Sequence, residues 1–133
     1  MLHDEITTAF AKQLNTSVKL ANKVFKYSSV STGERVILQL KGNNTFKNVQ
    51  EMNKTTLWIA VYVPLIDQKH INVLRHEELR KEIINKINES SFTEMGIFES
   101  ELITADGYFI NEETKTESIG VLIYSVNGVD NPD

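Results

Sequence analysis

The 133-residue sequence contains no cysteine. This absence excludes a disulfide scaffold, a thiol nucleophile and any zinc or iron–sulfur site that needs cysteine ligands. Long apolar runs are also missing: the longest uncharged one covers 10 residues, 57–66, and includes a proline. A helix that spans a membrane needs about 20 apolar residues. The first five residues carry two acids and no basic region. We therefore expect neither a membrane segment nor a signal peptide.

What the chain does contain is typical of one soluble domain. Hydrophobic residues make up 41% and charged residues 24% of the chain, which is close to the average of globular proteins and argues against a disordered one. A chain of this length buries enough surface to form a core without a metal or a disulfide. We therefore predict a single domain over residues 1–133.

The net charge of −4 is distributed unevenly along the chain. Residues 1–56 contain eight Lys or Arg and four Asp or Glu, whereas residues 57–133 contain six and fourteen. Two faces of opposite sign would favour one docking orientation between copies of the chain. The alternative is that both halves mix in the fold and their charges compensate. The sequence pI of about 5.4 argues against an autonomous DNA-binding domain.

Motifs that carry chemistry are absent from the sequence. There is no phosphate-binding glycine loop and no G-x-S-x-G nucleophile motif. We interpret the three histidines, His3, His70 and His76, as solvated helix residues. The segment H-E-E-L-R, which starts at His76, resembles a zinc-protease motif but has Arg80 where the second histidine ligand is needed. We therefore predict no catalytic residue, no metal site and no cofactor, and we do not expect an enzyme.

Local patterns in the first half of the chain predict a helix followed by strands. Residues 2–14 repeat apolar side chains at a spacing of three and four, as in an amphipathic helix. Alternation over residues 18–40, interrupted by a polar turn, predicts a β-hairpin, and residues 42–44 predict a further turn. Residues 55–63 are apolar on both faces, which predicts a central strand ended by Pro64. Such a strand needs a helix on one side and another layer or subunit on the other.

The second half of the chain predicts a long helix and the remaining strands. The helix covers residues 67–88, with Asp67 or Asn72 as its N-cap. A strand at residues 97–104, a tight turn at residues 106–107 and a closing strand at residues 118–126 follow. Together these elements predict an α+β fold. Its mixed, mostly antiparallel sheet would pack against one long helix plus an N-terminal helix.

This order of elements resembles that of the tail terminator proteins of long-tailed bacteriophages, and the resemblance covers most of the chain. Its specific points are the strand–proline–helix junction at residues 61–65 and the Asp106-Gly107-Tyr108 sequence before the last strand. The resemblance implies a structural protein of the virion tail or neck, assembled in the host cytoplasm. It also implies a homo-oligomer, a hexameric ring, that caps the tail tube and stops its polymerisation.

The resemblance implies partners as well. The ring would bind the tail tube protein on one side and offer a docking surface to the head connector or neck protein on the other, while DNA passes through its centre. A neck or tail-to-head joining protein is the alternative within the same class. A small nucleic-acid-binding or enzymatic domain is the alternative from another class, and a housekeeping domain of unassigned role is a third.

Contact residues for such an assembly are predicted among the aromatics of the central strand, the lysines of the hairpin region and the acids of the loop at residues 111–117. They are Lys41, Lys47, Trp58, Tyr62, Glu112, Glu113 and Glu117. Core burial is the alternative role of the two aromatics, and solvated loop charge is that of the others. We expect reversal of the three glutamates to lysine to weaken assembly and to leave the fold intact.

Overall fold

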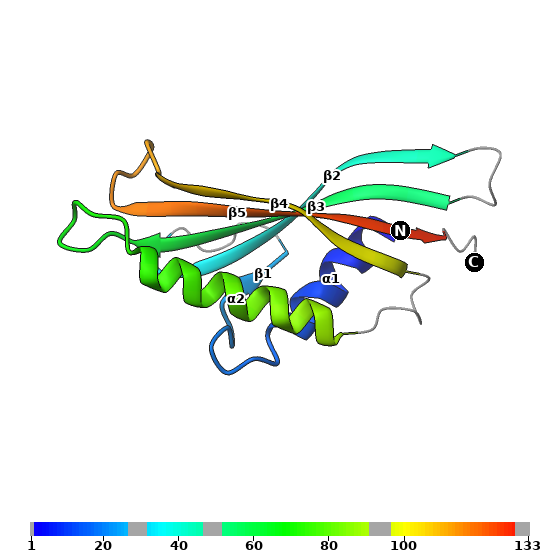
Figure 1. Ribbon diagram of the computed structural model, residues 1–133, viewed down its shortest axis with the longest axis horizontal. Helices are drawn as coiled ribbons and strands as arrows, with labels where there is room; N and C mark the ends of the chain where they lie inside the picture. The colour runs from blue at the N-terminus through cyan, green and yellow to red at the C-terminus, as the bar shows by residue number, and fades with distance from the viewer. Residues whose placement is uncertain (1, 27–31, 47–51, 91–96, 130–133) are drawn as a thin grey trace.

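The computed structural model describes residues 2–26, 32–46, 52–90 and 97–129. Figure 1 shows a long twisted sheet with both helices on the same side of it. The elements in chain order are α1 (Leu2–Leu14), β1 (Val24–Phe25), β2 (Arg35–Phe46), β3 (Met52–Pro64), α2 (Val73–Glu89), β4 (Ile97–Ile110) and β5 (Glu117–Val129). The predicted α+β class, with a mostly antiparallel sheet, one long helix and an N-terminal helix, is confirmed.

The described strands form one five-stranded sheet in the order β1-β2-β3-β5-β4. All neighbouring pairs are antiparallel except β1 and β2, which are parallel. β3 lies at the centre, as its apolar composition predicts, and it ends at Pro64. Neither described helix is long and apolar enough to cross a membrane.

The core lies between the helices and one face of the sheet. Residues that alternate along the three central strands point into it and are almost completely buried, for example Leu38, Ile59 and Leu122. From α1, Ile6 and Phe10 reach the same core because a spacing of four residues returns to one helix face.

Helix α2 contributes His76, Leu79, Ile83 and Ile87 to the core, at the same spacing of three and four residues. The helix begins after Asn72, whose side-chain oxygen accepts a hydrogen bond from the Arg75 N–H at 3.1 Å. One of the two predicted N-caps is thereby confirmed.

The other predicted N-cap, Asp67, is wrong. Asp67 and Gln68 have φ angles of 52° and 61°, in the left-handed region, and they turn the chain so that the Ile66 N–H donates to the His70 carbonyl at 2.7 Å. A chain in this conformation cannot continue into a right-handed helix. The helix therefore starts six residues later than Asp67, at Val73.

The predicted hairpin over residues 18–40 is also wrong. β1 has two residues and pairs parallel with β2, with Val24 opposite Val36. The hairpin of this region joins β2 to β3 instead, around residues 47–51, which lie outside the described part of the chain. Alternation identified the strands correctly, but it carries no information about which strand is the partner or in which direction it runs.

Both glycine-containing turns predicted inside the sheet are β-bulges. β2 continues through Gly42, with a shift of register between Lys41 and Asn43, and β4 continues through Gly107, with a shift between Ala105 and Tyr108. A bulge and a turn both need a local backbone irregularity, and glycine is suited to either. The glycines in the sequence correctly indicated where the backbone is irregular, but the chain does not reverse its direction there.

Gly120 lies where the sheet meets α2, and we predict that its replacement by a larger residue destabilises the fold. An added Cβ would stand 2.8 Å from Cδ1 of Tyr108 and 3.2 Å from Nδ1 of His76. Because the Tyr108 ring is held in place, we expect Gly120→Ala to lower the free energy of unfolding by about 1–3 kcal/mol. Urea denaturation measures this, with Gly107→Ala as the matched control because nothing lies within 4 Å of its added Cβ. Equal losses in the two variants would contradict the assignment.

Candidate assembly surface

The sheet face away from the helices, called the open face below, is apolar and covered by no described element. Along β3 the residues that point to the helices are buried, whereas Trp58, Ala60 and Tyr62 alternate with them and are only partly buried. The same alternation runs along β5, where Ile119, Val121 and Ile123 are partly buried. A central sheet region that is apolar on both faces therefore carries a covering layer on one face only.

Strand register arranges these side chains in rows across the sheet. Trp58 lies between Gln39 and Ile123, Ala60 between Ile37 and Val121, and Tyr62 between Arg35 and Ile119. The last row continues to Phe109 on β4, whose side chain is 51% exposed. Contiguous apolar surface of this kind, with polar groups around it, is typical of protein–protein contact sites.

A positively charged side chain lies over the ring of each of the two aromatic residues in the predicted contact set. The Lys41 Nζ lies 4.0 Å from the Trp58 ring centre, and the Arg35 guanidinium carbon lies 4.1 Å from the Tyr62 ring centre. Such contacts contribute about 0.5–1 kcal/mol at exposed sites and hold the rings in place. Trp58 and Tyr62 are therefore neither core residues nor loose surface groups.

Arg35 and Glu117 form a buried ion pair beside Tyr62. Two parallel hydrogen bonds join them, at 2.7 and 3.1 Å, and each side chain is only 5% exposed. Asn111 donates to Glu117 at 2.9 Å, and Arg35 also donates to the Gly33 carbonyl at 2.9 Å. Because Arg35 stabilises the charged carboxylate, the pKa of Glu117 is lowered.

The placement of Glu117 in a solvated acidic loop is therefore wrong. Glu117 is the first residue of β5 and is buried against Arg35. A lysine there would face Arg35 in a site with little access to water, so reversal of all three glutamates would not leave the fold intact. Glu112 and Glu113 are exposed between β4 and β5, as predicted.

Exposed charges of both signs lie along the open face. Lys41 is exposed beside Thr56, partway along the β2–β3 pair, which continues to Phe46 and Met52. Glu112 and Glu113 are exposed in the loop beyond Pro64 and Glu117, which also contains the exposed Lys115. Eight residues of β3 separate Thr56 from Pro64, or roughly 25 Å at strand rise. Lys47, the remaining predicted contact, lies outside the described residues.

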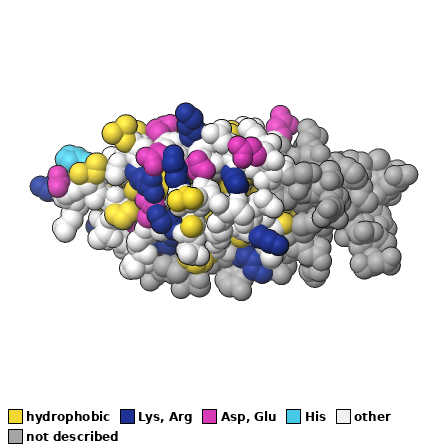
Figure 2. All heavy atoms as spheres, turned by 90° about the horizontal axis from the view of Figure 1, so that it is seen from below, with side chains coloured by type: hydrophobic (Ala, Val, Ile, Leu, Met, Phe, Trp, Pro, Cys, Tyr) yellow, Lys and Arg dark blue, Asp and Glu magenta, His cyan; other side chains and the backbone are white. Residues whose placement is uncertain are grey.

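The helix side of the molecule has a different character. Figure 2 shows Lys, Arg, Asp and Glu side chains intermixed over this side, with apolar side chains between them. Some of these charges bind elements together, since Arg75 of α2 donates to both carboxylate oxygens of Glu34 at 2.6 and 2.7 Å. The Arg75 guanidinium lowers the pKa of Glu34, which also pairs with Lys23 at 2.8 Å. This side resembles ordinary solvated surface.

A serine–histidine pair lies inside the protein. The Ser118 hydroxyl donates to the Val63 carbonyl at 3.3 Å, so the Nε2–H of His76 donates to the hydroxyl at 2.7 Å. The distance would suit a nucleophile and its base, but Ser118 is completely buried and His76 is 1% exposed. A substrate has no access to the pair. Its role in the fold is to fasten α2 to β3 and β5.

The interpretation of His76 as a solvated histidine is therefore wrong. His70 is exposed as predicted, but it lies in a turn before α2 and not in the helix. The ring of Tyr108 stacks on His76 with the ring centres 4.4 Å apart, and the Tyr108 hydroxyl donates to Glu77. Burial lowers the pKa of His76 to about 4, and the charge of Arg80 adds to this effect. His76 is thus neutral in the folded protein near pH 7.

No cluster of three or more histidine, aspartate or glutamate side chains that could hold a metal ion occurs among the described residues.

The predicted contact set named the aromatics of the open face, Lys41 and the two loop glutamates, but it missed Arg35. The available signal was a charged residue at an alternating position of an apolar strand, which indicates that a counterion lies nearby if the residue is buried. It does not indicate where, because Glu117 lies on β5, on the far side of β3.

We predict that the Arg35–Glu117 pair is needed for stability. Glu117→Gln keeps the shape of the side chain but leaves the guanidinium charge buried without its counterion. We expect a loss of about 3–5 kcal/mol in the free energy of unfolding. Glu112→Gln is the matched control in the neighbouring loop and should change it by less than about 0.5 kcal/mol. Urea denaturation of both variants tests this, and a loss for Glu117→Gln as small as that of the control would refute it.

We predict that His76 makes the protein less stable in weak acid. The unfolded chain takes up a proton at this histidine near pH 6.5, whereas the folded protein takes it up only near pH 4. Stability is therefore complete above pH 6.5 and decreases as the pH falls toward 4, by about 2 kcal/mol at pH 5. Glu34 and Glu117, whose pKa values are lowered, contribute stability that is lost only below their ordinary value of 4.5.

Urea denaturation at pH 7.5 and pH 5.0 measures this difference. His76→Gln should be less stable than the wild type at pH 7.5 but should lose little more at pH 5.0. His70→Gln, at an exposed histidine, should keep the pH dependence of the wild type. A His76→Gln protein with the full pH dependence would show that another group is responsible.

Comparison with protein-family models and with curated protein sequences gave no match. The functional argument for this chain therefore rests on its own residues. The feature that distinguishes it is the open face, with its rows of apolar side chains across β2, β3 and β5.

Proposed function

We propose that the protein is a structural subunit of a bacteriophage tail, a terminator that assembles into a ring on the end of the tail tube. The ring stops polymerisation of the tube and presents a different surface to the head connector or neck protein. The observation that carries this proposal is the open face. Its apolar rows across β2, β3 and β5 are what a subunit needs beyond its own core.

The exposed charges beside the open face support the same proposal. In a closed ring, each contact joins two different surfaces, head to tail. Lys41 on β2 and the loop acids Glu112 and Glu113 lie at separate places along the face, and attraction between these unlike charges on neighbouring copies would give such a contact its orientation. The serine–histidine pair is no evidence against this proposal, because it is buried and a substrate cannot reach it.

The oligomeric state of the purified protein tests the assembly. We expect a mass of several copies by light scattering, and we expect Val121→Glu to shift it to that of a monomer. Val121 is in the middle row of the open face, and burial of a carboxylate against a second copy is costly. Leu74→Glu is the matched control because Leu74 is 84% exposed on α2. A monomeric wild type, or equal masses for the two variants, would contradict assembly through this face.

Electron microscopy of particles that lack the protein tests the tail role itself. Overlong tail tubes are the expected result for a terminator. Tails of normal length without heads would identify a neck or joining protein instead. Strong, salt-dependent DNA binding by the isolated chain would favour the nucleic-acid-binding alternative.

A further inference from the structure

Among the described residues, the edge of β2 is only partly covered. β1 pairs with β2 at two positions, the last of which places Phe25 beside Ile37, whereas β2 continues to Phe46. Beyond Ile37, no described strand lies on this side of β2. An exposed strand edge of this kind presents backbone N–H and C=O groups to which another extended chain can pair.

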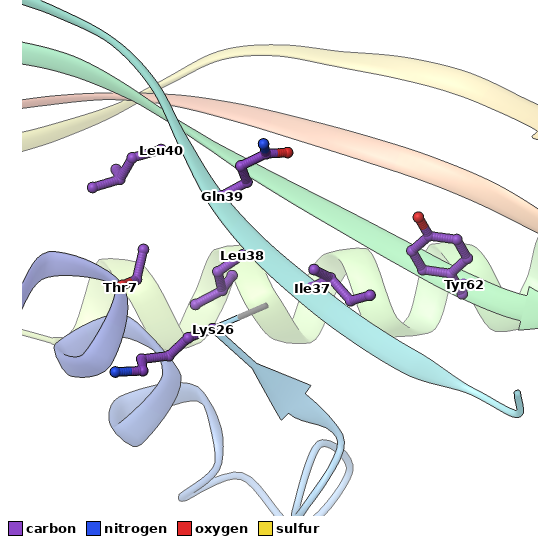
Figure 3. A pocket seen from close by; sticks show the side chains of 7 residues that line it. All are labelled: Thr7, Lys26, Ile37, Leu38, Gln39, Leu40 and Tyr62. Carbon is purple, nitrogen blue, oxygen red and sulfur yellow. The ribbon is translucent and has the colours of Figure 1, made fainter. Parts of the chain in front are cut away.

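A cavity of about 400 Å³ lies along this edge. Four consecutive β2 residues, 37–40, line it together with Thr7, Lys26 and Tyr62 (Figure 3). Side chains of consecutive strand residues point to opposite faces of a sheet, so a cavity that contacts four in a row lies beside the strand and not above one face. Figure 3 shows Thr7 on α1 and Tyr62 on β3, on either side of β2.

Backbone geometry indicates which groups an added strand would meet. The Val36 N–H donates to the Lys23 carbonyl at 2.8 Å, on the β1 side of β2. Backbone groups of alternate residues point the same way along a strand, so the Leu38 carbonyl and the Leu40 N–H face this side as well. Both border the cavity, past the last residue of β1.

We infer that the β2 edge binds an extended, net acidic peptide arm of a partner protein, which adds to the sheet as a further strand. Backbone pairing along residues 38–41 supplies the register, as in other cases of strand addition. The side chains that face α1 would be apolar because they meet Leu38 and the buried Thr7. The arm would be acidic because Lys26 is the charged residue of the cavity lining and Lys41 is exposed on the same strand.

The outer edge of β4 from a second copy is a less suitable occupant. β4 shifts its register at three places: between Ile97 and Glu99, between Leu102 and Thr104, and between Ala105 and Tyr108. Bulges twist a strand and interrupt its row of hydrogen-bonding groups, so they disfavour pairing between edges. A flexible arm has no such irregularity. This inference goes beyond the proposed function and does not depend on it.

A synthetic peptide tests strand addition directly. The probe is a fluorescein-labelled hexapeptide of alternating valine and glutamate, titrated with the full chain and followed by fluorescence anisotropy. We expect saturable binding with a Kd below about 1 mM and slower hydrogen–deuterium exchange in fragments that cover residues 37–41. The same peptide with N-methyl groups on all its backbone amides has no N–H donor on either edge, so it should bind at least tenfold more weakly. A valine–lysine peptide should also bind more weakly.

Two variants test whether the peptide binds at the β2 edge. Leu40→Pro removes the outward N–H and should abolish binding, whereas Lys69→Glu, at an exposed lysine outside this edge, should leave binding unchanged. Because Leu40 also packs against the core, Lys26→Glu is a second variant that avoids this contact. It should weaken binding of the valine–glutamate peptide and improve that of the valine–lysine peptide. Absence of saturable binding, equal binding of the N-methylated peptide, or protection elsewhere in the chain would each overturn the inference.

Discussion

A sheet that is apolar on both faces needs two covering layers, and the described part of this chain supplies one. The helices α1 and α2 bury one face of β2, β3 and β5, where Leu38, Ile59 and Leu122 are almost completely inaccessible. The alternate residues of the same strands, such as Trp58 and Val121, keep part of their surface in contact with water. Removal of that surface from water is favourable at about 25 cal/mol per Å², which would give the proposed association its driving force.

The polar interactions at the margins of this sheet position its surfaces and stabilise the fold. Arg35 and Glu117 neutralise each other in a site with little water, and Arg35 also lies over Tyr62, so the ion pair orders one end of the open face. His76 and Ser118 hold α2 against the opposite side of the same region. Loss of either contact would alter the fold before it altered any surface. Glu117 therefore stabilises the fold, and it is not one of the exposed charges of the neighbouring loop.

The edges of the sheet differ as much as its faces do. β4 has three register shifts, which protect its outer edge from pairing, whereas no described strand pairs with β2 after the two residues of β1. The open face and the β2 edge are therefore two separate means of contact. A face is recognised through apolar side chains and shape, whereas an edge is recognised through backbone hydrogen bonds. Under the two proposals, the open face would join copies of the chain, and the β2 edge would bind a different partner at the same time.

The sequence by itself determined the features that depend on neighbouring residues. Periodicity identified α1, the central strand β3 and its end at Pro64, and Asn72 as an N-cap, because helix and strand patterns repeat within a few residues. Only the tertiary structure decided which strands pair and which polar groups meet. Arg35 and Glu117 are 82 positions apart, and His76 and Ser118 are 42 apart, so neither contact leaves a local pattern. Likewise, a glycine can make a turn or a bulge, and the neighbouring strand decides between them.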